Sequence, residues 1–344
     1  MITLTLHEFD LPLRHPFTIS RESHTVQPTV IVELEEEGHR GYGEATTNPY
    51  YHVTVDSLRR SVESARDLLA QRSASVADFA PHDLWGELQP RLQHDPFALC
   101  AIDQAAHDLW GKLRGAPVYQ LWGLSLDRVP ASCFTIGIDS IDTMIAKLKE
   151  MPGWPVYKIK LGTDRDIEIV RRLRQQTDAA FRVDANCGWN VEESLQNAEA
   201  LRSLGVEFIE QPLPAGDLEG YRRLFQQSEL PVMADESCLV EADVARCVDH
   251  FHAINIKLVK CGGLTPARRM IAQARQLGLQ VMVGCMTEST VGISAIAQLL
   301  PLLDYVDMDG AALLAGDIAT GVTVAEGIAR FPEVHGNGVE LLAR

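Results

Sequence analysis

The chain has 344 residues, and its 31 lysines and arginines stand against 47 aspartates and glutamates, which gives a net charge of −16. The length suits one large domain or two. Because the chain is acidic, it has no electrostatic attraction for a phosphate backbone, and nucleic-acid binding is not expected. It also lacks a polybasic segment that would bind an anionic membrane.

The N-terminus lacks a basic segment followed by an apolar one, so we expect no signal peptide. The longest apolar runs, such as residues 293–303, fall short of the roughly 20 residues that span a bilayer. The seven cysteines are odd in number and form no C-x-x-C pair, which favours reduced thiols over a disulfide framework or zinc site. These features predict a cytoplasmic protein that does not associate with membranes.

Residues 1–45 are predicted to be rich in β-strand. The run 29–34 is apolar and β-branched and predicts a strand. The acidic segment 35–39 contains a glycine and predicts a turn, and Gly41–Glu44 is interpreted as a second, hairpin turn.

From about residue 54 to 114 the pattern becomes helical. Apolar residues recur there on one face of a 3.6-residue period: Leu99, Ile102, Ala106 and Leu109. Strands followed by helices predict an α+β unit, which we place at residues 1–125.

After about residue 130 a repeat begins, in which short apolar runs alternate with amphipathic segments. The last residues of these runs follow one another at intervals of 22 to 27 residues: Thr135, Lys160, Asp184, Glu210, Asp235, Lys257, Gly284 and Asp307. Eight strands at this spacing predict an α/β protein with a (β/α)₈-type barrel over residues 126–320. Residues 321–344 carry no barrel element and are expected to return to the N-terminal unit.

Five consecutive strand ends are ionisable, and strand ends meet at the mouth of a barrel, where active sites lie. In chain order they are Lys160, Asp184, Glu210, Asp235 and Lys257. A salt bridge at the rim is the alternative for any one of them, but it does not account for five in a row. Three adjacent carboxylates repel one another unless a cation lies between them, and oxygen ligands without histidine or cysteine favour Mg²⁺.

Lys158 precedes Lys160 by two residues, so strand alternation places both side chains on one face. Two like charges, with a metal ion nearby, are expected to lower the pKa of both lysines toward that of a useful base. A metal with lysines on two sides indicates abstraction of a proton α to a carboxylate, with Mg²⁺ stabilising the enediolate. One lysine would take the proton, and the other would return it on the opposite face.

Five motifs carry a resemblance to a known family. They are Lys158-Ile159-Lys160, Asp184-Ala185-Asn186, Glu210-Gln211-Pro212, Asp235-Glu236-Ser237 and Ile256-Lys257. In their order and spacing the chain resembles the enolase superfamily, muconate-lactonising subgroup. The resemblance implies a (βα)₇β TIM-like barrel with an α+β capping domain, which the C-terminal tail completes.

Two later segments resemble the dipeptide epimerase branch of that family. They are Gly284–Ser289 and Asp307–Gly310. In that branch the Asp-x-Asp segment binds the α-ammonium group of a dipeptide, and two acids at i and i+2 on an extended segment face the same way. The alternative for Asp307 is that it caps a turn. The resemblance implies a small dipeptide as the substrate, inverted at the α-carbon of its C-terminal residue.

The resemblance also implies a role for each site residue. Asp184, Glu210 and Asp235 would hold one Mg²⁺ per chain, and Lys160 and Lys257 would be the opposed acid/base pair. Lys158 would tune Lys160, Asn186 and Glu236 would support the metal ligands, and Asp307 and Asp309 would bind the ammonium group. Thr135, Cys285 and Met286 would contact the substrate. A homo-oligomer is common in the family.

The resemblance leaves the preferred side chain open. In the family a mobile loop of the cap, here residues 16–27, closes over the barrel, and members that act on Ala-Glu carry an arginine on it. Counting from Pro16 places Glu22 at that position, with Arg21 adjacent. Glu22 would favour a cationic or polar side chain or point to solvent, whereas Arg21 would favour an acidic one.

Two other functions compete with an epimerase. The first is a lyase or cycloisomerase of the same subgroup, similar to o-succinylbenzoate synthase or muconate cycloisomerase, which has no use for a paired-acid ammonium site. The second is a non-catalytic metal or carbohydrate binding protein on a barrel scaffold. The two lysines at opposed strand ends argue against the second.

Overall fold

The computed structural model of the chain describes residues 1–75, 77 and 79–343. Residues 76, 78 and 344, which belong to the predicted N-terminal unit and tail, lie outside the described residues. None of the helices in the described part is long and apolar enough to cross a membrane.

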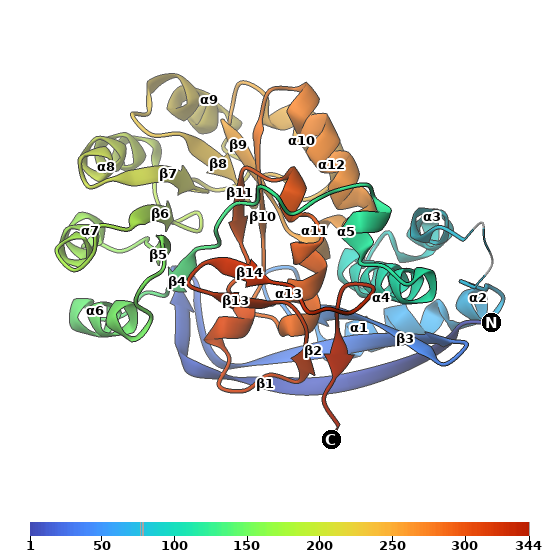
Figure 1. Cartoon of the computed structure of the whole chain (residues 1–344). Helices are drawn as coiled ribbons and strands as arrows, with labels where there is room; N and C mark the ends of the chain where they lie inside the picture. Colours follow the sequence, from blue (N-terminus) through green and yellow to red (C-terminus); the bar gives the residue numbers. More distant parts are fainter. Residues whose placement is uncertain (76, 78, 344) are drawn as a thin grey trace.

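The N-terminal part is an antiparallel sheet, β1-β2-β3, covered by helices. The two long strands β1 and β2 form a hairpin that continues to the Ile19–Glu22 pair and extends toward the barrel (Figure 1). The elements are β1 (Thr3–Ile19), β2 (Glu22–Glu36), β3 (His39–Thr46), α1 (Val55–Ser64), α2 (Arg66–Ala70), α3 (Pro81–Leu92), α4 (Pro96–Arg114) and α5 (Val118–Leu121).

The hairpin turn predicted at Gly41–Glu44 is wrong, because this segment lies inside β3. The turn between β2 and β3 is at Glu37 and Gly38, both with positive φ. The glycines of β3 serve a different purpose: a Cβ on Gly43 would lie 2.0 Å from the backbone oxygen of Ala101 in α4. Glycine is therefore needed here for close packing of the sheet on α4.

The second sheet has eight parallel strands, ordered β11-β10-β9-β8-β7-β6-β5-β4. A bridge between Ser132 and Val306 joins its two edges, so the sheet is a nearly closed barrel. The predicted fold class is thereby confirmed. The strands are β4 (Phe134–Ile136), β5 (Val156–Lys160), β6 (Ala180–Asp184), β7 (Val206–Glu210), β8 (Val232–Ala234), β9 (Ala253–Ile256), β10 (Gln280–Gly284) and β11 (Tyr305–Asp307).

Helices lie outside the barrel strands that they connect (Figure 1). They are α6 (Ile141–Glu150), α7 (Asp166–Arg174), α8 (Val191–Ser203), α9 (Leu218–Gln227), α10 (Glu241–Val244), α11 (Leu258–Cys261), α12 (Leu264–Gln276) and α13 (Thr290–Ala297), with 3₁₀ turns η1 (Ala245–Cys247), η2 (Leu300–Leu302) and η3 (Gly310–Leu313). Asp235 and Lys257 each lie one residue beyond their strand, at the start of the following loop.

The C-terminal segment forms two short strand pairs outside the barrel. They are β12 (Ala319–Thr320) with β15 (Glu340–Leu341), and β13 (Thr323–Ala325) with β14 (Ile328–Arg330). The backbone N–H of Asn337 donates to Asp108 of α4, and Lys112 of α4 donates to the backbone oxygen of Val339 at 2.6 Å. The tail therefore packs against the N-terminal unit.

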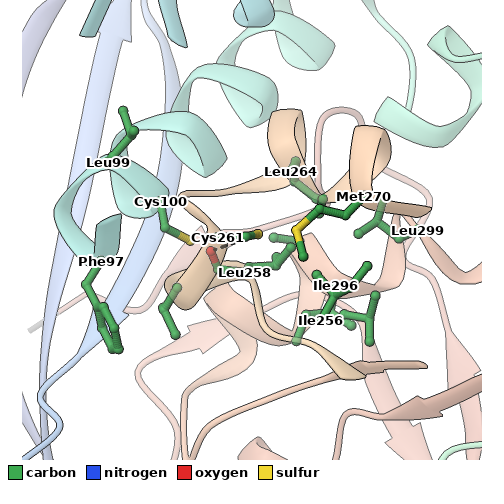
Figure 2. Packing of buried hydrophobic residues seen from close by; sticks show 14 of the residues in the cluster. Phe97, Leu99, Cys100, Ile256, Leu258, Cys261, Leu264, Met270, Ile296 and Leu299 are labelled. Carbon is green, nitrogen blue, oxygen red and sulfur yellow. Dashed lines mark hydrogen bonds between the residues drawn. The ribbon is translucent and has the colours of Figure 1, made fainter. Parts of the chain in front are cut away.

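The N-terminal unit and the barrel share one hydrophobic core. Figure 2 shows Leu99 and Cys100 of α4 beside Cys261 and Leu258 of α11. A buried polar contact adds to this packing, because Asp103 of α4 accepts a hydrogen bond from the hydroxyl of Thr265 in α12 at 2.7 Å. The cap is thus fixed to the side of the barrel, and its β1–β2 hairpin reaches the mouth.

Candidate active site

The sequence-predicted site residues come together at the carboxyl ends of the barrel strands. All but Asp184 and Glu210 line one cavity between the barrel mouth and the β1–β2 hairpin, and those two lie buried next to it. The cavity wall is formed by barrel and cap residues alike. The apolar strands stop at the mouth, so their last, ionisable side chains are directed into the enclosed space.

The three predicted metal ligands form a compact, fully buried cluster. One carboxylate oxygen of each of Asp184, Glu210 and Asp235 lies within 4.8 Å of the others. Burial and the neighbouring Asp184 carboxylate raise the pKa of Glu210 to about 7. Burial alone would raise the pKa of Asp235 too, but Lys257 and Lys260 outweigh it and hold that pKa well below its usual range.

The two predicted acid/base lysines approach this cluster from opposite sides. The ammonium of Lys160 on β5 donates to Asp184 at 2.7 Å, and that of Lys257 after β9 donates to Asp235 at 2.9 Å. Strands β5 and β9 are four positions apart in the eight-stranded barrel. A molecule held between the two amines would therefore meet one on each face.

Lys158 does not have the lowered pKa that the sequence analysis expects. Burial alone would lower the pKa, but the carboxylates of Asp307, Glu210 and Asp184 outweigh burial and raise it well above its usual value. The Lys158 ammonium lies 2.8 Å from both Asp307 and Glu210 and 3.2 Å from Asp184. Strand alternation placed it beside Lys160, but it did not reveal the three acids that surround it.

Three further residues hold the carboxylate cluster and were missed by the sequence analysis. The Gln211 side chain accepts the backbone N–H of Asp235 at 2.8 Å, and Asn255 donates to Glu210 at 2.8 Å. Lys260, 2% exposed, donates to the carboxylate of Asp235 and, at 2.7 Å, to its backbone oxygen. Gln211 follows a strand end and Asn255 lies within β9, so both could have been singled out, whereas Lys260 contacts the site only because α11 folds back.

The cluster fits a hard divalent cation. Its donors are carboxylate oxygens, which Mg²⁺ prefers. Two further buried oxygens beside the cluster, Asn186 Oδ1 and Glu236 Oε2, have no hydrogen-bond partner among the described residues. Because unpaired buried acceptors are costly, a cation and the molecules it brings would satisfy them.

Asp307 and Asp309 lie at the end of β11, on the side of the cavity next to Lys158. Asp309 accepts the backbone N–H and the hydroxyl of Thr135, at 2.6 and 3.3 Å. Burial and the adjacent Asp307 carboxylate raise the pKa of Asp309 to about 8. Burial alone would raise the pKa of Asp307, but the Lys158 ammonium outweighs burial and holds that pKa well below its usual value. Cys285 and Met286, in the loop after the neighbouring strand β10, complete this part of the wall.

The segment expected as a mobile loop, residues 16–27, is the end of the β1–β2 hairpin, where strand pairing runs from Phe17–His24 to Ile19–Glu22. At its tip the Arg21 guanidinium donates to Glu236 at 2.6 Å and lies 4.1 Å from the ring centroid of Tyr50. Glu22 lines the cavity beside it. The Arg21 guanidinium is therefore already paired with a carboxylate of the protein, that of Glu236.

Comparisons with known proteins agree with this site. The mandelate racemase / muconate lactonizing enzyme N-terminal domain matches residues 1–123, and the enolase C-terminal domain-like family matches residues 142–344. The chain belongs to the enolase superfamily. The predicted family is thus confirmed.

Among its relatives, the L-Ala-D/L-amino acid epimerase of Flavobacterium johnsoniae is 55% identical over 98% of this chain and 99% of that protein. The structure of a dipeptide epimerase from Cytophaga hutchinsonii with Mg and D-Ala-L-Val has a TM-score of 0.92 at 27% identity, covering 99% and 96% of the two chains. One from Methylococcus capsulatus with Mg and L-Arg-D-Lys has a TM-score of 0.89 at 32% identity, covering 98% and 99%. These relatives are epimerases, and the predicted enzyme class, an isomerase, is confirmed.

Proposed function

We propose that this enolase superfamily member is a dipeptide epimerase that inverts the α-carbon of the C-terminal residue of an L-Ala-L-Xaa-type dipeptide. One observation carries the proposal: Lys160 and Lys257 face each other across a cavity that also contains a buried carboxylate pair, Asp307 and Asp309. The 55% identity to an L-Ala-D/L-amino acid epimerase supports it.

The carboxylates of Asp184, Glu210 and Asp235 would hold Mg²⁺. When bound there, Mg²⁺ supplies positive charge against the negative charge that develops as the substrate becomes an enediolate. Asn255 holds the Glu210 carboxylate and Gln211 holds the backbone of Asp235 through their hydrogen bonds, so the ligands are oriented before the substrate arrives.

The two lysines would carry out a 1,1-proton transfer. A neutral amine on one face accepts the α-proton, and an ammonium on the other face donates a proton to the same carbon, which inverts it. Burial alone would lower the pKa of Lys257, but Asp235 outweighs burial and raises that pKa. Lys158 would keep the neighbouring acids neutralised.

The acids at the end of β11 would fix the amino end of the dipeptide. A substrate ammonium carries the charge that Asp307 and Asp309 can pair with, and Thr135 orients Asp309. This contact separates a dipeptide from the substrates of a lyase or cycloisomerase of the same subgroup, which have no ammonium to bind. Cytoplasmic location and a homo-oligomer stay predictions.

The proposal is tested by incubating L-Ala-L-Xaa pools with the protein and Mg²⁺ in D₂O and following mass shifts and epimer formation. Exchange and inversion at the C-terminal α-carbon are expected, and both should stop in EDTA. Absence of exchange in every pool would overturn the proposal. The double variant Asp307→Asn with Asp309→Asn should abolish epimerisation; retained turnover of a cyclohexadiene or muconate-type substrate would favour the lyase or cycloisomerase.

A further inference from the structure

The walls of the cavity differ in what they offer to a substrate. The barrel contributes the lysines, the metal-ligand candidates and the acids at the end of β11, and the cap contributes uncharged and apolar groups together with Arg21 and Glu22. If the carboxylate, the amino end and the two faces of the α-carbon are held by the barrel, as in the proposed function on which this inference rests, the remaining substituent is the C-terminal side chain. The C-terminal side chain must therefore point toward the cap.

Two polar atoms on the cap wall have no hydrogen-bond partner in the part of the chain that the structure describes. His24 Nε2 and Thr46 Oγ1 are both buried, line the cavity and have no hydrogen-bond partner among the described residues. Thr46 is fully buried and lies on the same face of β3 as Glu44, whose carboxylate accepts hydrogen bonds from Ser289 of the barrel. The Thr46 hydroxyl is therefore directed at the barrel mouth.

The His24 ring is held from the opposite strand. It contacts Phe17 edge to face, with ring centroids 5.9 Å apart, in the strand pair next to the hairpin tip. Burial lowers the pKa of His24, and Glu22 offsets this only in part. At neutral pH the imidazole is thus an uncharged hydrogen-bonding group.

No wall of the cavity leaves a cation for an acidic side chain, within the part of the chain that the structure describes. Each lysine and arginine that lines it has a carboxylate partner within 3.2 Å, namely Arg21, Lys158, Lys160 and Lys257. Glu22 adds a negative charge to the cap wall. A substrate carboxylate placed there would be repelled.

We propose that His24 and Thr46 form the recognition site for the C-terminal side chain, and that this site selects an uncharged side chain with a hydrogen-bonding group, such as threonine, serine, glutamine or asparagine. A buried polar atom without a partner is unfavourable, because it has lost its hydrogen bonds to water. A substrate hydroxyl or amide removes that cost on binding, whereas a hydrocarbon of the same shape leaves it in place.

Two pairs of nearly isosteric dipeptides test the inference with the Mg²⁺-loaded enzyme. L-Ala-L-Thr differs from L-Ala-L-Val in one hydroxyl, and L-Ala-L-Gln differs from L-Ala-L-Glu in charge. We expect kcat/KM to be at least about tenfold higher for the first member of each pair. For Thr over Val this is the size of one hydrogen bond, about 1.4 kcal/mol, and for Gln over Glu it reflects the repulsion of the substrate carboxylate. Equal values within both pairs would overturn the inference. Absence of exchange with every dipeptide would instead overturn the proposed function.

Variants locate the effect. Thr46→Val and His24→Phe keep the volume and the ring packing but remove the polar atoms, so each should reduce the Thr/Val ratio several-fold, and Thr46→Ser should restore it. Thr18→Val is the matched control, because Thr18 lies on the same hairpin but pairs with Ser23 at 2.8 Å and does not line the cavity. A ratio unchanged in both folded variants, checked by circular dichroism, would contradict the assignment.

Discussion

The Lys158 ammonium donates a hydrogen bond to Asp307 at 2.8 Å and lies equally close to Glu210. One buried cation therefore contacts acids of two kinds. Glu210 is proposed to hold the metal, and Asp307 is proposed to hold the substrate ammonium. Together with Lys160, Lys257 and Lys260, this amine allows several carboxylates to share one barrel mouth, so the stability of the mouth depends in part on Lys158.

We expect Lys158→Met to destabilise the metal-free protein. Removing one partner of a buried ion pair leaves unpaired buried carboxylates and costs about 3–5 kcal/mol. Mg²⁺ binds the native state, so it should recover part of this loss and shift Tm more in the variant than in the wild type. Calorimetric Tm values in EDTA and in Mg²⁺ measure both effects.

Lys147→Met provides the control, because the Lys147 side chain is also buried but pairs with Asp139 at 3.2 Å, away from the cavity. It should not change the response to Mg²⁺. A Lys158→Met protein as stable as the wild type in EDTA would contradict the role given to Lys158.

The two acid/base lysines are expected to have separable roles. Lys160→Ala and Lys257→Ala should each slow epimerisation by about 10²–10⁴-fold, the usual contribution of a general acid or base. Each variant should still exchange the α-proton of one epimer, because the remaining lysine faces only one side of the carbon. Proton NMR in D₂O, started separately from the two epimers, measures this.

Lys149→Ala, at an exposed position of α6, should exchange both epimers at the wild-type rate. If a single lysine variant exchanged both epimers equally, one amine would serve both faces and the two-lysine mechanism would fail.

The barrel could be predicted in detail because its signal is local. Every predicted barrel strand overlaps an observed one, since each apolar run except the one that ends at Gly284 stops at a polar residue, as at Lys160 and Asp184. The glycines of β3 show where local reasoning failed. Gly43 in a strand and a glycine in a turn have the same sequence signature, and only the position of α4 distinguishes them.

The site residues also fall into a group that the sequence predicts and a group that it does not. The cluster of Asp184, Glu210 and Asp235 follows from strand ends that converge, and it was predicted. Lys260, which pairs with Asp235, was not predicted, and neither was the pairing of Arg21 with the neighbouring Glu236. The two cations come from a helical turn and from a hairpin tip whose positions depend on tertiary packing. Their effects therefore could not be read from spacing.

The pKa of Asp309 predicts a pH dependence for binding of the amino end. With a pKa raised to about 8, Asp309 is mostly protonated at pH 7 and becomes charged as the pH rises. Pairing with a substrate ammonium requires the charged form, so kcat/KM should rise toward pH 8 and then fall as the α-amino group, with a pKa of about 8, loses its proton. In Asp309→Asn the rise should disappear.

Proton release measures the same event independently. Calorimetry at pH 7 in two buffers of different ionisation enthalpy should show a proton released when the wild type binds a dipeptide. The Asp309→Asn variant should release less. A kcat/KM profile that is flat between pH 6 and 8 in the wild type would contradict the assignment.

Finally, the contact between β3 and α4 predicts opposite effects for two glycine substitutions. A Cβ on Gly43 would lie 2.0 Å from the backbone oxygen of Ala101, so Gly43→Ala must displace the sheet from α4 and should cost about 1–3 kcal/mol or more. Gly86, inside α3, has nothing within 4 Å of such a Cβ, so Gly86→Ala should be stabilising by up to about 1 kcal/mol. Urea unfolding of both variants in Mg²⁺ compares them. Equal midpoints would mean that Gly43 is not required for this packing, and the interpretation of β3 would have to be abandoned.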